Sequence, residues 1–185
     1  MPRVSLPLLD EAIDARARAT REEHPFWPCA VGCDACCRSL PHLPTIAAEE
    51  WARVWDAIAT LEDDVRAGVI ARTLAAAGAT GPLTCPLLDG ARGACRVYDA
   101  RPIACRTYGF YTERDAGLHC ERVTRAIDER GVQSAVVWGN GEAVLRELRA
   151  LGEAVALDVW LRAQLTPNGT DQTGETAERP SRVGS

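Results

Sequence analysis

The chain has 185 residues, of which 46% are hydrophobic and 25% are charged. This balance is typical of one globular domain and excludes a collagen-like or wholly disordered chain. The 26 acidic residues outnumber the 21 basic ones and give a formal charge of -5. Because nucleic-acid-binding domains usually carry a basic face, nucleic acid is not an expected partner.

The first predicted helix covers residues 8–23, where Leu9, Ile13 and Ala17 recur at helical spacing. Residues 25–44 then contain four prolines and four cysteines. Because proline interrupts helices and strands, this composition predicts a cysteine-rich loop with one short helical turn.

An αα pair is predicted to follow this loop. Thr45 is placed to cap the first of the two helices. The apolar residues of that helix share one face: Trp51, Val54, Trp55, Ile58 and Leu61. Asp63 and Asp64 favour the start of the second helix, which the glycines at 78 and 81 end.

Residues 84–109 are broken by proline and glycine and can hold short elements only. Asn140 is placed to cap a final long helix, which Gly152 is expected to bend. Its apolar residues repeat at helical spacing: Val144, Leu148, Leu151, Val155 and Val159. Residues 167–185 offer almost nothing to bury and are predicted to be disordered.

Eight cysteines are the strongest chemical feature of the chain. They form one dense cluster and one dispersed set: Cys29, Cys33, Cys36 and Cys37, then Cys85, Cys95, Cys105 and Cys120. Two thiolates separated by two residues can turn around one metal ion, as in zinc knuckles and iron–sulfur loops. Neighbouring side chains in extended backbone point to opposite sides, so Cys36 and Cys37 predict two metal sites or one polynuclear site.

These residues are also compatible with other interpretations. Cys120 is as compatible with a buried apolar role as with a metal ligand, since free cysteine is a small hydrophobe. The spacing of Cys29, Cys33 and Cys36 also matches radical S-adenosylmethionine enzymes, but the chain lacks their alternating strands and helices, and Ala35 replaces the usual aromatic residue. Three histidines near the cysteines could complete a mixed site, although a surface or capping role is favoured for each: His24, His42 and His119.

With these motifs in view, the chain resembles the CxxCxxCC cysteine-cluster family of zinc- or iron-chelating proteins. The resemblance covers roughly residues 29–120. It rests on the block ending in Cys36-Cys37, on Cys85-Pro86-Leu87-Leu88, on Gly93-Ala-Cys95-Arg96-Val97-Tyr98, and on Arg101-Pro102-Ile103-Ala104-Cys105-Arg106. One departure is that Cys29 lies four positions before Cys33, where the family has three.

The resemblance implies metal chelation. Some relatives are thought to hold iron–sulfur clusters, and some, such as flagellin lysine methylases, carry the cluster within a longer chain. It also implies that Tyr98, Arg101 and Arg106 donate hydrogen bonds to sulfur or fix the loop beside the ligands. The alternative is a structural turn in which Arg101 pairs with Asp99 or another carboxylate.

The expected fold is mainly α, a small irregular helical domain that frames a cysteine-rich, loop-built metal centre. We expect an N-terminal helix (1–24), a metal-binding core (25–122), a C-terminal helical region packing on that core (123–166) and the disordered tail. The expected cofactor is zinc or iron, with an iron–sulfur cluster as one form, held by all eight cysteines. A cluster-dependent redox or methyl-transfer enzyme, an accessory subunit of one, and a thiol–disulfide protein remain as alternatives.

The expected setting is the cytoplasm, where a reducing environment keeps clustered thiols available for metal or redox chemistry. No charged and apolar leader precedes the cysteines, and no apolar stretch approaches the roughly 20 residues that cross a bilayer. We therefore expect no membrane partner, whereas a protein partner is compatible with the sequence.

Overall fold

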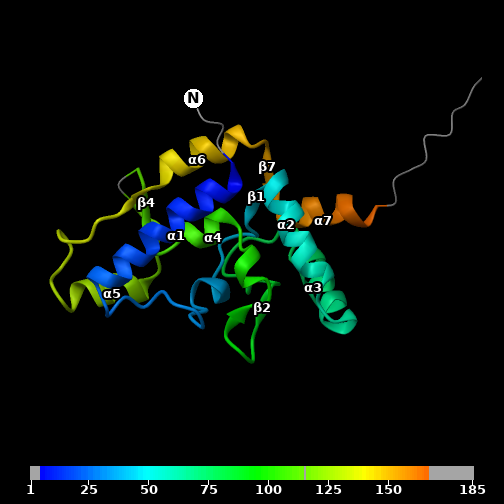
Figure 1. The fold of residues 1–185 in the computed structure, drawn as a ribbon. Coiled ribbons are helices and arrows are strands. Elements are labelled where there is room, and N and C mark those ends of the chain that lie inside the picture. Colours follow the sequence, from blue (N-terminus) through cyan, green and yellow to red (C-terminus); the bar gives the residue numbers. More distant parts are fainter. Residues whose placement is uncertain (1–4, 115, 167–185) are drawn as a thin grey trace, which may run out of the picture.

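The computed structural model describes residues 5–114 and 116–166 and contains seven α-helices within them (Figure 1). In chain order these helices are α1 (Leu6–Glu23), α2 (Ala48–Ala59), α3 (Asp63–Ala75), α4 (Ile103–Thr107), α5 (Glu121–Asp128), α6 (Gly141–Ala150) and α7 (Leu157–Leu165), with two 3-10 turns, η1 (Cys36–Arg38) and η2 (Tyr98–Ala100). Roughly half of the described residues are helical. The mainly α prediction therefore holds, and the predicted disordered tail (167–185) lies outside the described residues.

Short strands join the helices. They are β1 (Thr45–Ala47), β2 (Leu88–Asp89), β3 (Ala94–Cys95), β4 (Tyr111–Glu113), β5 (Ala116–Gly117), β6 (Gly139–Asn140) and β7 (Ala154–Ala156). The pairs β1–β7, β2–β3 and β4–β5 are antiparallel, and β4–β6 is parallel. An all-α fold is therefore not confirmed, because these short strands, which the sequence did not predict, join distant loops.

The start of α2 differs from the prediction. Thr45 does not cap this helix, because it lies in β1 opposite Ala156. The N-cap is Ala47, and the Glu50 carboxylate accepts a hydrogen bond from its backbone N–H at 2.8 Å. The helix begins two residues later than a cap at Thr45 would place it, because strand pairing holds residues 45–47 extended.

The prediction of one final long helix is also wrong. Asn140 does cap α6, since its Oδ1 accepts a hydrogen bond from the Ala143 N–H at 2.9 Å. The chain then turns at Gly152, whose φ of +132° favours glycine, and it enters β7 before α7 begins. Two helices therefore replace one, and the second packs against α3.

Two hydrophobic clusters of buried residues support the fold. The first is formed by side chains of α1, α5 and α6 together with Trp27 and Phe110. The second is formed by side chains of α2, α3 and α7 together with residues near β2 and η2. The cysteine-bearing loops contribute to both clusters, which places the thiols where the clusters approach each other.

None of the helices in residues 5–114 and 116–166 combines the length and the apolar character needed to cross a membrane.

Candidate metal centre

The fold brings the eight cysteines together from five segments of the chain. They come from the loop around η1, the turn before β2, the strand β3, the helix α4 and the start of α5. All eight thiols are free; Cys85 is buried and the others are half-buried. Five of them line one small cavity of about 60 Å³: Cys29, Cys33, Cys36, Cys105 and Cys120. A cavity of this volume has room for a few atoms of the size of water.

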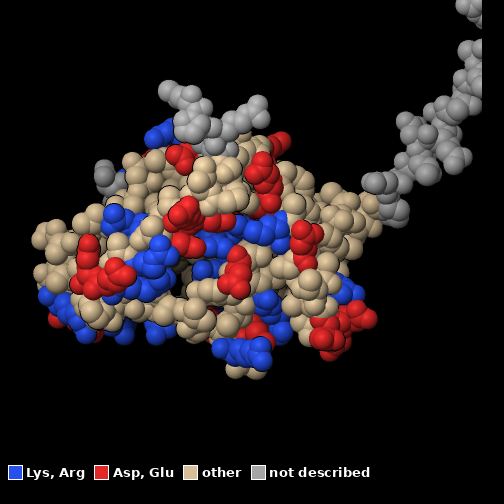
Figure 2. All heavy atoms as spheres, viewed as in Figure 1, with Lys and Arg blue, Asp and Glu red and all other residues tan. Residues whose placement is uncertain are grey.

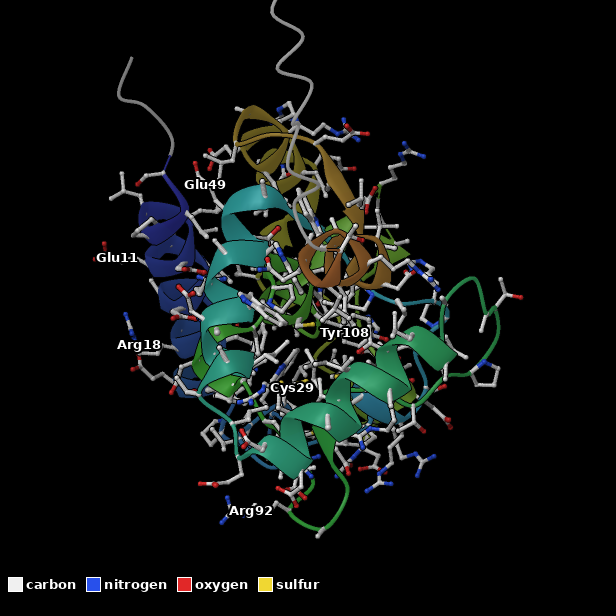
Figure 3. The ribbon with its side chains drawn as sticks, turned by 90° about the vertical axis from the view of Figure 1, so that its right-hand side faces the viewer. Glu11, Arg18, Cys29, Glu49, Arg92 and Tyr108 are labelled. Carbon is white, nitrogen blue, oxygen red and sulfur yellow. The ribbon has the colours of Figure 1, made fainter. Side chains whose placement is uncertain are left out.

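Cys29, Cys33 and Cys120 form what we call thiol group A. Burial, and after it the neighbouring thiols of Cys33, Cys120 and Cys36, raise the pKa of the Cys29 thiol to about 12. Cys29 and Cys120 also pack against the first hydrophobic cluster. Figure 3 shows Cys29 and Tyr108 toward the interior, with the labelled Arg18 and Glu11 around the outside. Group A is therefore a set of near neighbours, all three of which line the cavity.

The backbone at Gly109 leaves room for Cys29. Gly109 has a φ of +92°, and a Cβ placed there would lie 2.5 Å from Cys29 Sγ. The Gly109 carbonyl accepts a hydrogen bond from Trp27 Nε1 at 3.1 Å, which ties this turn to the loop that carries Cys29. A glycine is thus required here both by the backbone conformation and by the close approach of sulfur.

Cys37, Cys85, Cys95 and Cys105 form thiol group B. The Cys37 carbonyl accepts a hydrogen bond from the Cys85 N–H at 2.6 Å. A hydrogen bond with Cys36 lowers the pKa of the Cys37 thiol, but a hydrogen bond with Cys85 and burial outweigh it and raise this pKa to about 12. Burial also raises the pKa of Cys105 to about 12, assisted by Cys95 and Cys37.

Cys36 lies between the two groups. The hydrogen bond with Cys37 and, after it, burial raise the pKa of the Cys36 thiol. Cys36 also helps to raise the pKa of Cys29 in group A and of Cys95 and Cys105 in group B, through the repulsion between thiolates. The eight predicted ligands are therefore assembled as one continuous set, with Cys36 at the junction.

Within the described part of the chain, no three His, Cys, Asp or Glu side chains are arranged to hold a metal ion as they stand. Burial raises the pKa of the Cys29 and Cys105 thiols to about 12, and the pKa of the Cys36 thiol is raised by its hydrogen bond with Cys37 and then by burial. The donor chemistry suits zinc or iron, and loss of protons with rotation of the side chains is required before a metal is bound.

Tyr98, Arg101 and Arg106 line the same cavity as five of the cysteines. The Arg101 guanidinium lies 3.5 Å from the centre of the Tyr98 ring and donates from Nε to the Tyr98 carbonyl at 2.8 Å. No ion pair between Arg101 and Asp99, or another carboxylate, occurs among the described residues. Arg101 therefore stacks on an aromatic ring instead of pairing with an acid.

Arg106 fixes the loop to α1. Its side chain is 9% exposed and forms ion pairs of 3.2 Å with both Asp10 and Asp14. It also donates hydrogen bonds to the carbonyls of Arg101 and Asp99. This network attaches α4, which carries Cys105, to the N-terminal helix.

Two further positioning residues were missed by sequence reasoning. Glu50 is fully buried, and its second carboxylate oxygen accepts a hydrogen bond from the Ile103 N–H at 2.6 Å, so one side chain caps both α2 and α4. Arg122 donates a hydrogen bond to Cys33 Sγ at 3.6 Å. The acidic first turn of α2 was a signal for Glu50, but nothing local indicated its contact with a residue 53 positions away.

The histidines take structural positions. His24 is buried beside Phe26 and Trp27, His42 hydrogen-bonds through Nδ1 to a backbone carbonyl at 2.8 Å, and His119 stacks on Trp138. None of the three lines the thiol cavity. These positions agree with the favoured interpretation of structural histidines.

Helices that frame a loop-built set of free thiols define the class of protein: a cysteine-cluster protein with sulfur donors suited to zinc or iron. The chain belongs to the CxxCxxCC family, whose model is described as a putative zinc- or iron-chelating domain and matches residues 28–126, just over half of the chain. The family predicted from the motifs is confirmed, and its match includes all eight cysteines. No curated protein and no solved structure matches the chain.

Proposed function

We propose that the chain binds zinc or iron at a two-part thiolate centre. Group A together with Cys36 supplies four sulfur donors, and group B supplies four more. Four thiolates satisfy a tetrahedral zinc ion, and four thiolates also hold an iron–sulfur cluster. The observation that carries the proposal is the convergence of eight free thiols from five segments of the chain, five of them lining one small cavity.

The surroundings of the thiols support this proposal. Arg21, Arg101 and Arg122 are near enough to act on the thiols electrostatically or by a hydrogen bond. Cations beside several thiolates offset the negative charge that metal binding creates. The raised pKa values of Cys29, Cys37 and Cys105 argue against a thiol–disulfide protein, because a catalytic thiol needs a lowered pKa to be nucleophilic.

A second candidate function is that of a cluster-dependent redox or methyl-transfer enzyme, or an accessory subunit of one. It is favoured by a groove that opens beside the thiols and shares residues with their cavity. Purely structural zinc sites are closed, whereas sites that react keep an open side. This function requires the iron–sulfur form of the centre.

The first experiment is an elemental count of zinc and iron per chain on protein purified without oxygen, with a visible spectrum of the same sample. Two zinc ions and no colour support a structural or zinc-handling role. Iron with acid-labile sulfide and absorption near about 400 nm supports the cluster-dependent alternative. Folded protein without stoichiometric metal would contradict both.

Single substitutions then test the division into two parts. Cys29→Ser removes a ligand from group A, and Cys105→Ser removes one from group B. In a two-part centre each variant loses about half of the metal, whereas in one polynuclear centre either variant loses nearly all of it. His42→Ala is the matched control, because His42 flanks the first cluster but contacts only backbone, and its metal content is expected to stay unchanged. Full metal content in both serine variants would show that these cysteines are not ligands.

A further inference from the structure

A groove of about 410 Å³ runs along α1 and opens beside the thiol cavity. Four arginines and two aspartates are among its lining residues: Arg18, Arg21, Arg101, Arg106, Asp14 and Asp99. Figure 2 shows basic side chains gathered around a hollow in the middle of this face. The volume lies within the range of small-molecule sites, roughly 300–1,000 Å³.

The groove and the thiol cavity are continuous. Arg21, Tyr98, Arg101 and Arg106 line both of them. A molecule held in the groove would therefore lie directly beside the sulfur donors. Arg18 lines the groove but not the thiol cavity, and it is exposed.

The arginines differ in how far their hydrogen-bonding capacity is already used. Arg106 is occupied by Asp10 and Asp14. Arg21 and Arg101 each donate from Nε to a backbone carbonyl, at 3.0 Å and 2.8 Å. Within the described residues their Nη atoms form no further hydrogen bond, and neither arginine pairs with a carboxylate. These two guanidinium groups are therefore held through Nε and keep their Nη donors available.

We infer that this groove is a binding site for a small molecule that carries two or more carboxylate or phosphate groups, held by Arg18, Arg21 and Arg101. Guanidinium groups bind both kinds of oxyanion through paired N–H donors, so the two share one recognition chemistry. The Nε bonds of Arg21 and Arg101 hold their forks in place, which reduces the entropy lost on binding. Arginines that only offset the charge of the thiolates would need neither an open groove nor Arg18. The open volume therefore favours a binding site over charge compensation alone.

The inference deepens the proposed function by placing an anionic ligand next to the metal centre, but its test does not depend on metal. Binding is measured by isothermal titration calorimetry on the full chain as purified, and the metal content of the same sample is recorded. The probes are tricarballylate for carboxylates and pyrophosphate for phosphates. The trimethyl ester of tricarballylate is the neutral control with the same carbon skeleton.

The decisive variant is Arg18→Gln, since Arg18 is exposed and its substitution is expected to leave the fold intact. Loss of one charge-assisted contact is expected to weaken binding about tenfold. Arg149→Gln is the matched control, because it removes an exposed arginine on α6 that does not line the groove, and its affinity should change less than about twofold. Arg101→Lys keeps the charge but loses the fork, so it should also weaken binding.

Binding of tricarballylate or of pyrophosphate identifies the source of the oxyanion, and either result supports the inference if Arg18→Gln weakens it and Arg149→Gln does not. Equal losses in both variants would mean non-specific attraction and would overturn the inference, as would binding of neither anion. Anion binding by a chain without metal would refute the proposed function and leave this inference standing. If the metal-loaded chain bound neither anion, this inference would be refuted and the proposed function would stand.

Discussion

Glu50 provides the sharpest test of how the fold positions the centre. Its carboxylate is fully buried and accepts hydrogen bonds from the N–H groups of Ala47 and Ile103 at 2.8 Å and 2.6 Å. Glu50→Ala leaves both donors buried without a partner, at the starts of α2 and α4. Each hydrogen bond to a charged group contributes about 1.5–3 kcal/mol, and relief of the buried charge offsets part of the loss. We expect the free energy of unfolding to fall by about 2–4 kcal/mol.

The assay is urea unfolding of the metal-loaded protein, followed by tryptophan fluorescence. An unchanged dependence on urea concentration with a lower midpoint would show that stability, and not the extent of unfolding, has changed. Glu49→Ala is the control, because Glu49 lies in the same first turn but is exposed, and its effect should stay within about 0.5 kcal/mol. If Glu50→Ala were no more destabilising than Glu49→Ala, the assignment of Glu50 as a shared cap would be refuted.

Four further predictions follow from the site. Burial raises the pKa of Glu50. The extra stability that comes from this raised pKa is fully present below the unfolded pKa of about 4.3 and is lost as pH rises through the folded value, while the hydrogen bonds of the ionised carboxylate remain. Unfolding measured across this range should show the advantage of wild type over Glu50→Gln shrinking with pH, and a growing advantage would contradict this prediction. Gly109→Ala places a Cβ 2.5 Å from Cys29 Sγ at a φ of +92°. It should lower the stability of the protein by about 2–4 kcal/mol, measured by thermal unfolding. Gly90→Ala is the control and should change the stability little, because a Cβ at Gly90 has no neighbour within 4 Å. Removal of metal by a chelator should increase hydrogen exchange in η1 and the β2–β3 hairpin before it does so in α2 and α3. The reason is that metal binding contributes on the order of 10 kcal/mol to the folding of zinc peptides. A uniform increase in exchange throughout the chain would count against a local metal centre. Metal binding at pH 7 should release at least three protons, detected by calorimetry in buffers of different ionisation enthalpy, since burial, with hydrogen bonding in the case of Cys37, raises the pKa of three ligand thiols to about 12: Cys29, Cys37 and Cys105.

The sequence was sufficient wherever the information is local. Apolar spacing predicted α1 and α3, a polar residue predicted the cap of α6, and the dense cysteine motif predicted the family. The errors occurred where distant segments meet. Thr45 looks like a helix cap until β7, more than 100 residues away, pairs with it. From its position in the sequence, Gly152 predicts only a bend in a helix. The helix ends there because the residues that follow pair with β1 as the strand β7.

The same reason limited the prediction of the site. The sequence indicated which residues have sulfur donors. It predicted Cys36 and Cys37 on opposite sides of extended backbone, whereas both lie in the 3-10 turn η1 and their thiols hydrogen-bond to each other. It could not indicate that Cys120 lies near Cys29, or that Cys85 bonds to the backbone of Cys37. These pairings depend on loop closures of roughly 50 to 90 residues, which periodicity and motif spacing do not encode.

The pairing of β1 with β7 has a consequence for the order in which the molecule is built. All eight cysteines precede β7 in the chain, and β7 is the segment that joins the second half of the fold back to β1. During synthesis from the N-terminus, every sulfur donor is therefore made before the strand that closes the fold. A metal ion that meets the growing chain finds all eight proposed ligands while α7 and β7 are still missing, so the proposed centre has an opportunity to be loaded before the C-terminal segment packs against α3.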